Sequence, residues 1–419
     1  MPLWFRLLYS LLWIAALPVV LARLLWRSRR NPDYRKHWSE RLTFDLPNPH
    51  LGHFDVWLHA VSVGEARAAA PLVRHFARRN QRIIITCTTP TGRATCAELY
   101  ANQAQIAYLP FDAPFLMRRF LRAAKPKLGL LMETELWPGT CDAAKALGVP
   151  MWLINARLSE RSARGYGRAG SLTRSMLACL DGVAAQTRAH ADRFGAIGAQ
   201  NVHVVGNLKF DLSLPSELQQ RADALTELMT GGHAARPYWV AGATRQGEEV
   251  ALLKALKVHP LREAALAVIV PRHPERWAEV VEASRKLGFR TARRSDPIIA
   301  ADTEVLIGDS MGELLIYYAN AKACVMGGTF AGTGGQNLIE PCSVGVPVAL
   351  GPSVFNFQQA ADEAIAAGAA IRVPDARGGV DAVYEWLHDE SWRKLASVRA
   401  RAFVAQHRGA TERTLALLQ

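Results

Sequence analysis

Short apolar runs alternate with helical patterns along most of the chain. Runs at residues 56–62, 83–89 and 128–134 have the length and apolar content of buried strands, and helical spacing of apolar positions follows each of them. This alternation is typical of a parallel sheet that helices cover on both faces. The pattern therefore predicts an α/β protein with doubly wound, Rossmann-like sheets.

The alternation is interrupted once and then restarts. The interruption is a polar helical stretch at about residues 211–236, after which six further strand-like runs follow with helices between them. A chain of 419 residues is long enough for two domains of ordinary size. We therefore expect two Rossmann-like domains, at residues 31–215 and 216–419, that face a cleft.

The N-terminal segment, residues 1–30, has a different composition. It is apolar from Leu7 to Ala22, with Arg6 before this run and a cluster of arginines after it. A terminal, strongly apolar helix with a basic flank favours a membrane anchor over a buried helix, and the basic side indicates that the rest of the chain is cytoplasmic. A helix that spans the membrane and one that lies in a single leaflet both fit the pattern.

The net charge of +13 indicates an anionic partner, such as nucleic acid, an acidic membrane surface or a phosphorylated substrate. No helix-turn-helix, zinc-finger or aromatic stacking motif accompanies the arginines, so we predict no nucleic-acid partner. The six cysteines lack metal-ligand spacing, and no D-x-D motif occurs, so we predict neither a metal site nor a cofactor.

Acidic residues follow two predicted strands in the first half of the chain. Glu65 comes three residues after Ser62, which is the spacing of a helix capping box, so capping alone would account for it. Glu133 and Glu135, however, follow another strand of the same predicted sheet. Carboxylates grouped at one edge of a sheet can raise the pKa of one member and make it a useful base.

Basic residues follow later strands of this half. Arg157, Arg161, Arg164 and Arg168 are spaced as one helical face, for which either a solvated surface or an anion contact is expected. Lys209 directly follows a strand, so we expect its charge to reach the cleft and meet a phosphate.

The second half has four loops of ligand-binding composition at predicted strand ends. They are GATRQGEE, where backbone N–H groups at a helix start would form a small anion site; VPRHPER, with Arg272 and His273; GDSMGEL; and GGTFAGTGGQNLIE. In the last loop, the start of a short helix near residues 334–337 predicts a phosphate site. Glu340 shares a face with Asn337 and is placed to accept from sugar hydroxyls. Together these loops are typical of a two-domain nucleotide-sugar glycosyltransferase.

The motifs are also specific in their order. SVGEA, TPTG, METELWP, INARLSERS, LKFD, VPRHPER, GDSMGEL, GGQNLIE and GPSVFNF run through nearly the whole chain. In this order they resemble the 3-deoxy-D-manno-octulosonic acid (Kdo) transferases, which are lipid A glycosyltransferases. The resemblance implies a GT-B fold, with an acceptor-binding first domain and a nucleotide-sugar-binding second domain.

The resemblance also implies an activity and its residues. The reaction would be metal-independent, inverting transfer of Kdo from CMP-Kdo to a lipid A precursor (lipid IVA) at the cytoplasmic face of the inner membrane. Glu65 would be the general base, and Glu133 and Lys209 would support the transition state. CMP would be held by Arg272, His273, Met311, Gly312, Glu313, Asn337, Leu338, Ile339 and Glu340.

Two positions depart from the family pattern: Gly139, where an asparagine is usual, and Gln336, where many members have histidine. Other readings of the sequence are another GT-B enzyme, such as a heptosyltransferase or a nucleotide-sugar epimerase, and a non-catalytic membrane scaffold. A panel of nucleotide-sugar donors would separate the enzymes. Tight CMP binding without turnover would identify the scaffold.

Overall fold

The computed structural model describes residues 3–29, 31–46, 53–212, 214–230 and 236–418. The chain divides into two compact units. Unit 1 consists of Met1–Asp211 with Arg408–Gln419, and unit 2 consists of Leu212–His407.

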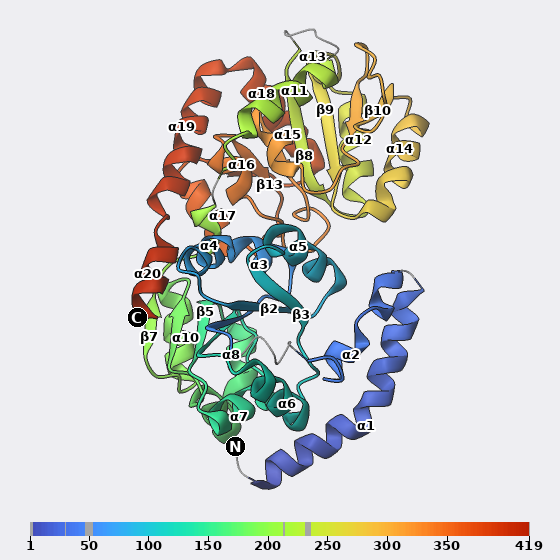
Figure 1. Cartoon of the computed structure of the whole chain (residues 1–419). Coiled ribbons are helices and arrows are strands. Elements are labelled where there is room, and N and C mark those ends of the chain that lie inside the picture. The colour runs from blue at the N-terminus through green and yellow to red at the C-terminus, as the bar shows by residue number, and fades with distance from the viewer. Residues whose placement is uncertain (1–2, 30, 47–52, 213, 231–235, 419) are drawn as a thin grey trace. The chain divides into compact units, whose positions relative to one another are not determined.

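Unit 1 is built on a seven-stranded parallel sheet with the strand order β3-β2-β1-β4-β5-β6-β7 (Figure 1). Its strands are β1 (Val56–His59), β2 (Ile83–Cys87), β3 (Ala104–Tyr108), β4 (Leu128–Met132), β5 (Met151–Ala156), β6 (Gly182–Ala185) and β7 (Val202–Val204). Its helices are α1 (Leu3–Ser28), α2 (Trp38–Arg41), α3 (Val63–Ala68), α4 (Ala70–Arg78), α5 (Pro90–Tyr100), α6 (Pro114–Ala124), α7 (Pro138–Leu147), α8 (Glu160–Arg168), α9 (Gly170–Leu177), α10 (Arg188–Ala196) and α20 (Ala410–Leu417), with the 3-10 turns η1 (Pro32–Arg35) and η3 (Leu208–Asp211).

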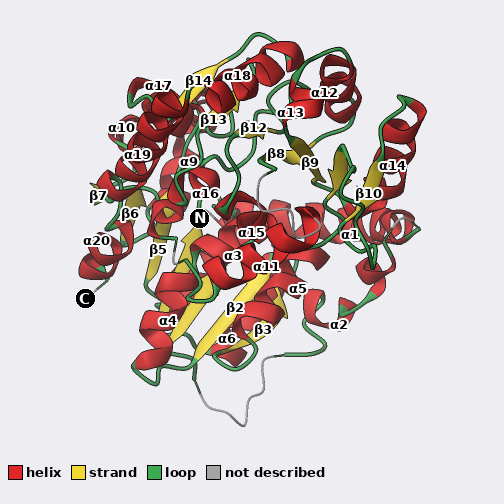
Figure 2. Ribbon diagram, turned by 90° about the horizontal axis from the view of Figure 1, so that it is seen from above, coloured by secondary structure: helices red, strands yellow, loops and turns green. Residues whose placement is uncertain are grey.

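The apolar runs form strands because both faces of the sheet are buried. Trp57 of β1 packs in one hydrophobic core, whereas its neighbours Val56 and Leu58 pack in a second core on the opposite face. Residues on both faces must therefore be apolar, which explains why these strands read as continuous apolar runs. Helices cover both faces of the sheet (Figure 2).

Unit 2 repeats this architecture with a seven-stranded parallel sheet in the order β10-β11-β9-β8-β12-β13-β14. Its strands are β8 (Tyr238–Thr244), β9 (Leu266–Pro271), β10 (Thr291–Arg293), β11 (Val305–Ile307), β12 (Cys324–Met326), β13 (Val348–Leu350) and β14 (Ala370–Arg372). Its helices are α11 (Leu218–Thr230), α12 (Glu248–Lys257), α13 (Leu261–Ala264), α14 (Trp277–Lys286), α15 (Leu314–Ala319), α16 (Ile339–Ser343), α17 (Gln358–Ala366), α18 (Ala376–His388) and α19 (Glu390–Gln406), with the 3-10 turn η4 (Pro274–Arg276).

The predicted fold class is confirmed: two doubly wound α/β sheets follow an apolar N-terminal helix. The edge strand β10 was not expected. Its sequence, Thr-Ala-Arg, contains one apolar residue, so no apolar run marks it. The helix α1 is long and apolar enough to cross a membrane, with a mean hydropathy of 2.0 over its most apolar window, none of which is buried.

The C-terminal helix α20 belongs to unit 1, although the sequence placed residues 216–419 in one domain. The Asp211 carboxylate accepts hydrogen bonds from the backbone N–H groups of Gly409 (2.7 Å) and Thr411 (2.5 Å). Arg413 of α20 donates to the carbonyl of Val205, just beyond β7. These contacts attach the end of the chain to the last strand of the first sheet.

Gly139, one of the two departures from the family pattern, lies in a tightly packed turn. A Cβ atom at this position would lie 2.0 Å from the carbonyl oxygen of Asp112. The Asp112 carboxylate also accepts hydrogen bonds from the N–H groups of Gly139 and Thr140, each at 2.7 Å. The close approach of Asp112 explains the glycine, because no larger residue fits without moving the backbone.

We therefore expect Gly139→Ala to destabilise unit 1 by about 3 kcal/mol, at the upper end of the cost of overpacking. Thermal or urea unfolding would measure the loss. The matched control is Gly165→Ala in α8, where an added Cβ has no neighbour within 4 Å. Equal stability of the two variants would show that the turn relaxes without cost.

Candidate active site

The first candidate site lies at the carboxyl ends of the unit 1 strands. Glu65 follows β1, Glu133 follows β4, Arg157 follows β5 and Lys209 follows β7. Because all strands are parallel, their carboxyl ends meet at one edge of the sheet, where ligands of such folds bind. The structure places Glu65, Glu133 and Lys209 together at this edge, as the sequence predicted.

Glu133 is the centre of this cluster. Its Oε1 lies 2.8 Å from the Lys209 Nζ, and its Oε2 lies 2.9 Å from the Arg157 Nε. Burial would raise the pKa of Glu133, but the charges of Lys209 and Arg157 outweigh it and hold this pKa below its usual value. Glu133 is thus a fixed, neutralised carboxylate at neutral pH.

The backbone at Glu133 is strained in a way that aims this side chain. Its φ is +56°, in the left-handed region that a residue other than glycine rarely adopts. Asn155, at the end of the neighbouring β5, has a φ of +49°, and its Oδ1 accepts from the N–H of Leu208 in η3. Such conformations cost free energy and cluster at functional sites. Here they turn two strand ends toward the segment that carries Lys209.

Glu65 has a different environment. It occupies the first turn of α3, where Ser62 is the N-cap, so the predicted capping geometry is present. Its carboxylate accepts from the Val61 N–H (2.9 Å) and the Ser62 hydroxyl (2.8 Å), and the residue is 8% exposed. Burial, followed by the nearby charge of Glu133, raises the pKa of Glu65 to about 7. A capping residue that titrates near neutrality can also accept a proton in a reaction.

Two further groups border the acids. The Trp137 indole donates to Glu135 (2.8 Å), and burial raises the pKa of Glu135 despite this hydrogen bond. The fully buried His59 has its Nε2 at 3.9 Å from the same carboxylate, and burial lowers the pKa of His59 to about 4. His59 is therefore neutral and adds no positive charge to the cluster.

Arg157 was expected on a helical face with Arg161, Arg164 and Arg168. The helix α8 instead begins at Glu160, and Arg157 precedes it in the segment that leaves β5. Its ion pair with Glu133 makes it part of the cluster, whereas the other three arginines are exposed. The available signal was that Arg157 directly follows the strand β5.

The second candidate site lies at the carboxyl ends of the unit 2 strands. Arg272 and His273 follow β9, and Arg272 is exposed. The His273 Nε2 lies 2.7 Å from the Arg245 Nη1. An arginine can only donate, so this ring nitrogen accepts, and burial with the Arg245 charge lowers the pKa of His273. The neutral ring then carries its proton on Nδ1.

The remaining predicted residues of this site lie in two other loops. Met311 and Gly312 follow β11 and are exposed, and Glu313 faces Arg221 (3.4 Å) and Arg294 (3.6 Å). In the loop after β12, Asn337 donates to the Glu340 Oε1 at 3.1 Å, so these two side chains share a face as expected. Leu338 and Ile339 are almost fully buried, and the N–H of Ile339 is already bonded to the Asn337 side chain.

Two expectations about anion binding need correction. The helix α16 contains five residues, too few for a sizeable macrodipole, and the Asn337 Oδ1 accepts from the N–H of Ile339 at its start. In the GATRQGEE turn, the N–H of Arg245 is taken by the carboxylate of Glu248 (2.8 Å). An internal acid thus occupies the place where the sequence suggested a bound anion.

Glu248 is the residue of this site that the sequence did not reveal. It is 2% exposed, and its carboxylate also accepts from the N–H groups of Gly328 (2.7 Å), Phe330 (2.8 Å) and Ala331 (3.1 Å). It therefore fixes the glycine-rich loop that follows β12 to the start of α12. In the sequence, an acid in the first turn of a helix is explained by helix capping alone. No local pattern therefore indicates that Glu248 also binds the loop after β12.

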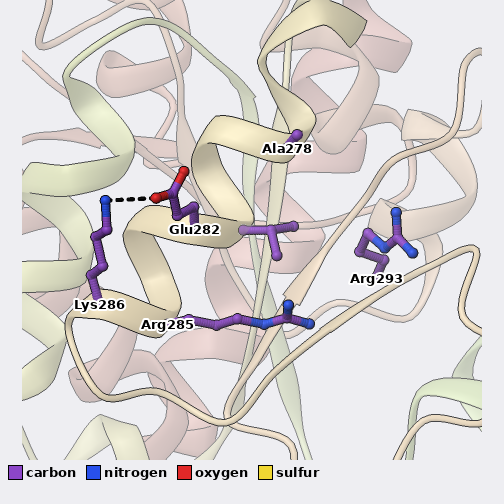
Figure 3. Close-up of a pocket in the computed structure, with 6 residues that line it drawn as sticks. Ala278, Glu282, Arg285, Lys286 and Arg293 are labelled. Carbon is purple, nitrogen blue, oxygen red and sulfur yellow. Dashed lines mark ion pairs between the residues drawn. The ribbon is translucent and has the colours of Figure 1, made fainter.

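A groove on unit 2 is separate from these loops. It has a volume of about 620 Å³ and is lined by α14 and β10, with Ala278, Glu282, Arg285, Lys286 and Arg293 around it (Figure 3). Glu282 and Lys286 form an ion pair across one helical turn. None of the predicted site residues lines this groove. Within the described parts of the chain, no group of three His, Cys, Asp or Glu side chains is arranged to hold a metal ion.

Comparison with known proteins places these features in a class and then in a family. The fold resembles that of UDP-GlcNAc 2-epimerase from Neisseria meningitidis bound to UDP-GlcNAc, with a TM-score of 0.60 over 87% of this chain and 99% of that one, at 15% identity. The two Rossmann-like sheets are therefore those of the GT-B class.

The sequence comparisons are more specific. The family described as "3-Deoxy-D-manno-octulosonic-acid transferase (kdotransferase)" matches residues 36–212. The 3-deoxy-D-manno-octulosonic acid transferase of Bordetella pertussis is 44% identical over 87% of this chain and 86% of its own length. That of Haemophilus influenzae is 32% identical over 99% and 98%. The chain belongs to the Kdo transferase family, and it is a glycosyltransferase of lipopolysaccharide synthesis.

Proposed function

We propose that this protein transfers Kdo from CMP-Kdo to a hydroxymethyl group of a lipid A precursor, lipid IVA, with inversion at the anomeric carbon. The observation that carries the proposal is the acid cluster of unit 1. It pairs a buried glutamate whose pKa is about 7 with a second glutamate that two cations neutralise. The cluster supplies a base and positive charge, the two functions that transfer from a sugar phosphate requires.

In the proposed reaction, the acceptor hydroxyl attacks the anomeric carbon of Kdo from the side opposite to CMP. The carbon–oxygen bond to the acceptor forms while the bond to the phosphate oxygen breaks, and CMP leaves with both electrons of that bond. Glu65 takes the proton of the attacking hydroxyl. Lys209 and Arg157, held by Glu133, provide positive charge where negative charge develops.

Unit 2 would hold CMP. Arg272 and the Nδ1–H of His273 are donors suited to phosphate, and Asn337 with Glu340 is suited to the ribose hydroxyls. Leu338, Ile339 and the segment Met311 to Glu313 would complete the nucleotide site, as the family resemblance implies. In this proposal the leaving phosphate is met by protein cations and the Nδ1–H of His273.

A mass spectrum of lipid IVA after incubation with CMP-Kdo and the full chain tests the reaction. We expect the acceptor mass to rise by whole Kdo residues, and the number added gives the stoichiometry. UDP-sugars and ADP-heptose serve as competing donors. Transfer or epimerisation of one of these, with no transfer from CMP-Kdo, would replace the proposal with the heptosyltransferase-like or epimerase alternative.

The role of Glu248 gives a second test. Glu248→Ala removes the acceptor of three N–H groups in the loop after β12, so we expect CMP to bind at least about tenfold more weakly, by the general worth of buried hydrogen bonds to a charged group. Isothermal titration calorimetry with CMP measures the loss. The control is Glu282→Gln in the ion pair of α14, which should leave the affinity unchanged. Undiminished CMP affinity in a folded Glu248→Ala protein would contradict the role of this loop.

A further inference from the structure

The N-terminal helix α1 presents two different faces. The side chains of Arg6, Tyr9, Trp13 and Leu17 are half-buried against unit 1, and Ser28 at the end of the helix is buried. The opposite side, which we call the outer face, is apolar and exposed. It consists of Leu3, Trp4, Leu7, Leu8, Leu11, Leu12, Ile14, Val19, Leu25 and Trp26.

The start of α1 is fixed to unit 1 by polar contacts. The guanidinium of Arg6 donates to the Asp142 carboxylate of α7 at 2.9 Å, and Asp142 is almost fully buried. The Tyr9 hydroxyl donates at 2.8 Å to Asp112, the residue that holds the Gly139 turn. Trp13 packs on Phe111 with ring centroids 5.9 Å apart. Thus Arg6 and Tyr9, near the start of the helix, are directed toward the protein.

The end of α1 is fixed to the same unit. Ser28 accepts from the Arg35 guanidinium at 2.8 Å, and the Arg27 guanidinium lies over the Tyr34 ring. The following helix α2 is anchored in turn to the carboxyl ends of the first sheet. There Glu40 accepts from the Tyr108 N–H, and Arg41 donates to the Thr88 carbonyl.

These contacts conflict with a helix that crosses a bilayer. A crossing helix places its ends on opposite sides of a hydrocarbon layer about 30 Å thick. Here both ends of a helix about 39 Å long are attached to one folded unit, which lies along its inner side (Figure 1). If α1 crossed, the Arg6–Asp142 pair and the adjoining surface of unit 1 would have to enter hydrocarbon, which is costly.

The outer face has the composition of a surface that meets lipid. Ten of the 22 large apolar side chains that are exposed among the described residues lie on this one helix. Trp4 and Trp26 stand near its two ends, where the headgroup region favours indole rings. Arg23, Arg27 and Arg29 are exposed beside it and suit anionic headgroups.

We propose that α1 does not span the membrane but lies in the plane of an anionic lipid bilayer, held to unit 1 by Arg6 and Tyr9 on its inner side and inserted by its outer face. The helix is then a rigid part of unit 1 and sets the height of this unit above the lipid. This proposal rests on the proposed function in one respect: it takes the acceptor of the reaction to be a membrane lipid.

The first experiment determines on which side of the membrane each end of the full chain lies. Protease-cleavable tags are added to both ends, and cleavage is compared in intact spheroplasts and in inverted inner-membrane vesicles. We expect both tags to be cut in the inverted vesicles and neither to be cut in spheroplasts. Cleavage of the N-terminal tag in spheroplasts, with the C-terminal tag protected, would show a spanning helix and overturn the proposal.

The second experiment tests the outer face with vesicles that contain phosphatidylglycerol. The purified full chain should float with these vesicles, and the variant Leu7→Ser/Leu11→Ser should lose at least about tenfold in vesicle affinity, since each buried leucine contributes strongly to transfer into lipid. The matched control is Leu395→Ser/Val398→Ser on α19, where both residues are also exposed. Equal binding of the two variants would refute the role of the outer face.

Transfer to a detergent-dispersed acceptor is measured on the same variants. If Leu7→Ser/Leu11→Ser loses vesicle binding but still transfers Kdo to this acceptor, then α1 acts in membrane binding and not in the chemical reaction. Absence of transfer in every variant and in the parent protein would refute the proposed function while leaving the vesicle result to decide the position of the helix.

Discussion

Replacing Glu65 with glutamine should reduce turnover by about a hundredfold or more while the protein remains folded, since this is the usual cost of losing a general base. Glutamine keeps the size of the side chain and can accept from Val61 and donate to Ser62, so the cap of α3 is preserved. CMP affinity should be unchanged, because the residues proposed to hold CMP belong to unit 2. A Glu65→Gln protein that transfers Kdo at close to the parental rate would exclude Glu65 as the base.

The pH dependence provides an independent check of the same residue. A base must be deprotonated to act, so kcat/KM of the parent should rise through about pH 7, the pKa to which burial and Glu133 raise Glu65, and then level off. The residual activity of Glu65→Gln should lack this rise.

Stability should respond in the opposite direction. The carboxyl of Glu65 ionises near 4.5 in the unfolded chain and near 7 in the folded one, so between these values the folded state binds the additional proton. The contribution of Glu65 to stability is therefore present below about pH 4.5 and is lost as the pH rises to about 7. The melting temperature of Glu65→Gln relative to the parent should accordingly be higher at pH 8 than at pH 5.

Lys209→Ala should have the second largest effect, a loss of turnover of about a hundredfold with a much smaller loss of CMP affinity. The ammonium group is only slightly exposed and lies 2.8 Å from the Glu133 carboxylate. In the proposed reaction its positive charge stabilises the negative charge that develops on the departing phosphate. Steady-state kinetics with CMP-Kdo, together with calorimetry of CMP, separate the two quantities.

Two variants serve as comparisons for this prediction. Lys127→Ala removes a lysine of unit 1 that also pairs with a carboxylate at 2.8 Å but lies on the surface, and it should leave turnover unchanged. Lys209→Arg keeps the charge and should recover part of the lost rate. If Lys209→Ala instead raised the donor KM at an unchanged kcat, the lysine would have a plain binding role.

Much of the fold could be predicted because both faces of each sheet are buried, so that most strands appear in the sequence as short, continuous apolar runs. Each apolar run that the sequence indicated became a strand, whereas β10, with one apolar residue, left no such trace. The approximate place of the sites followed from one rule: parallel strands direct their carboxyl ends to the same edge. That rule brings Glu65, Glu133 and Lys209 together without any knowledge of their contacts.

What escaped prediction depends on contacts between distant segments. The pairing of Arg157 with Glu133 requires the left-handed backbone of Glu133, which no local pattern signals. Glu248 looks like an ordinary cap until the loop some 80 residues later folds onto it. Gly139 departs from the family pattern in sequence, and only the approach of the Asp112 carbonyl, which lies 27 residues away along the chain, explains it.

The return of α20 to unit 1 gives the protein an inserted rather than a tandem topology. Unit 2 occupies the interval between Asp211 and Arg408, and the Asp211 carboxylate ties the two sides of this interval together through Gly409 and Thr411. Two covalent connections therefore join the units, so a single proteolytic cut in either would leave the halves tethered. Removing the last residues of the chain would damage the first unit, not the second, although the second precedes them in sequence.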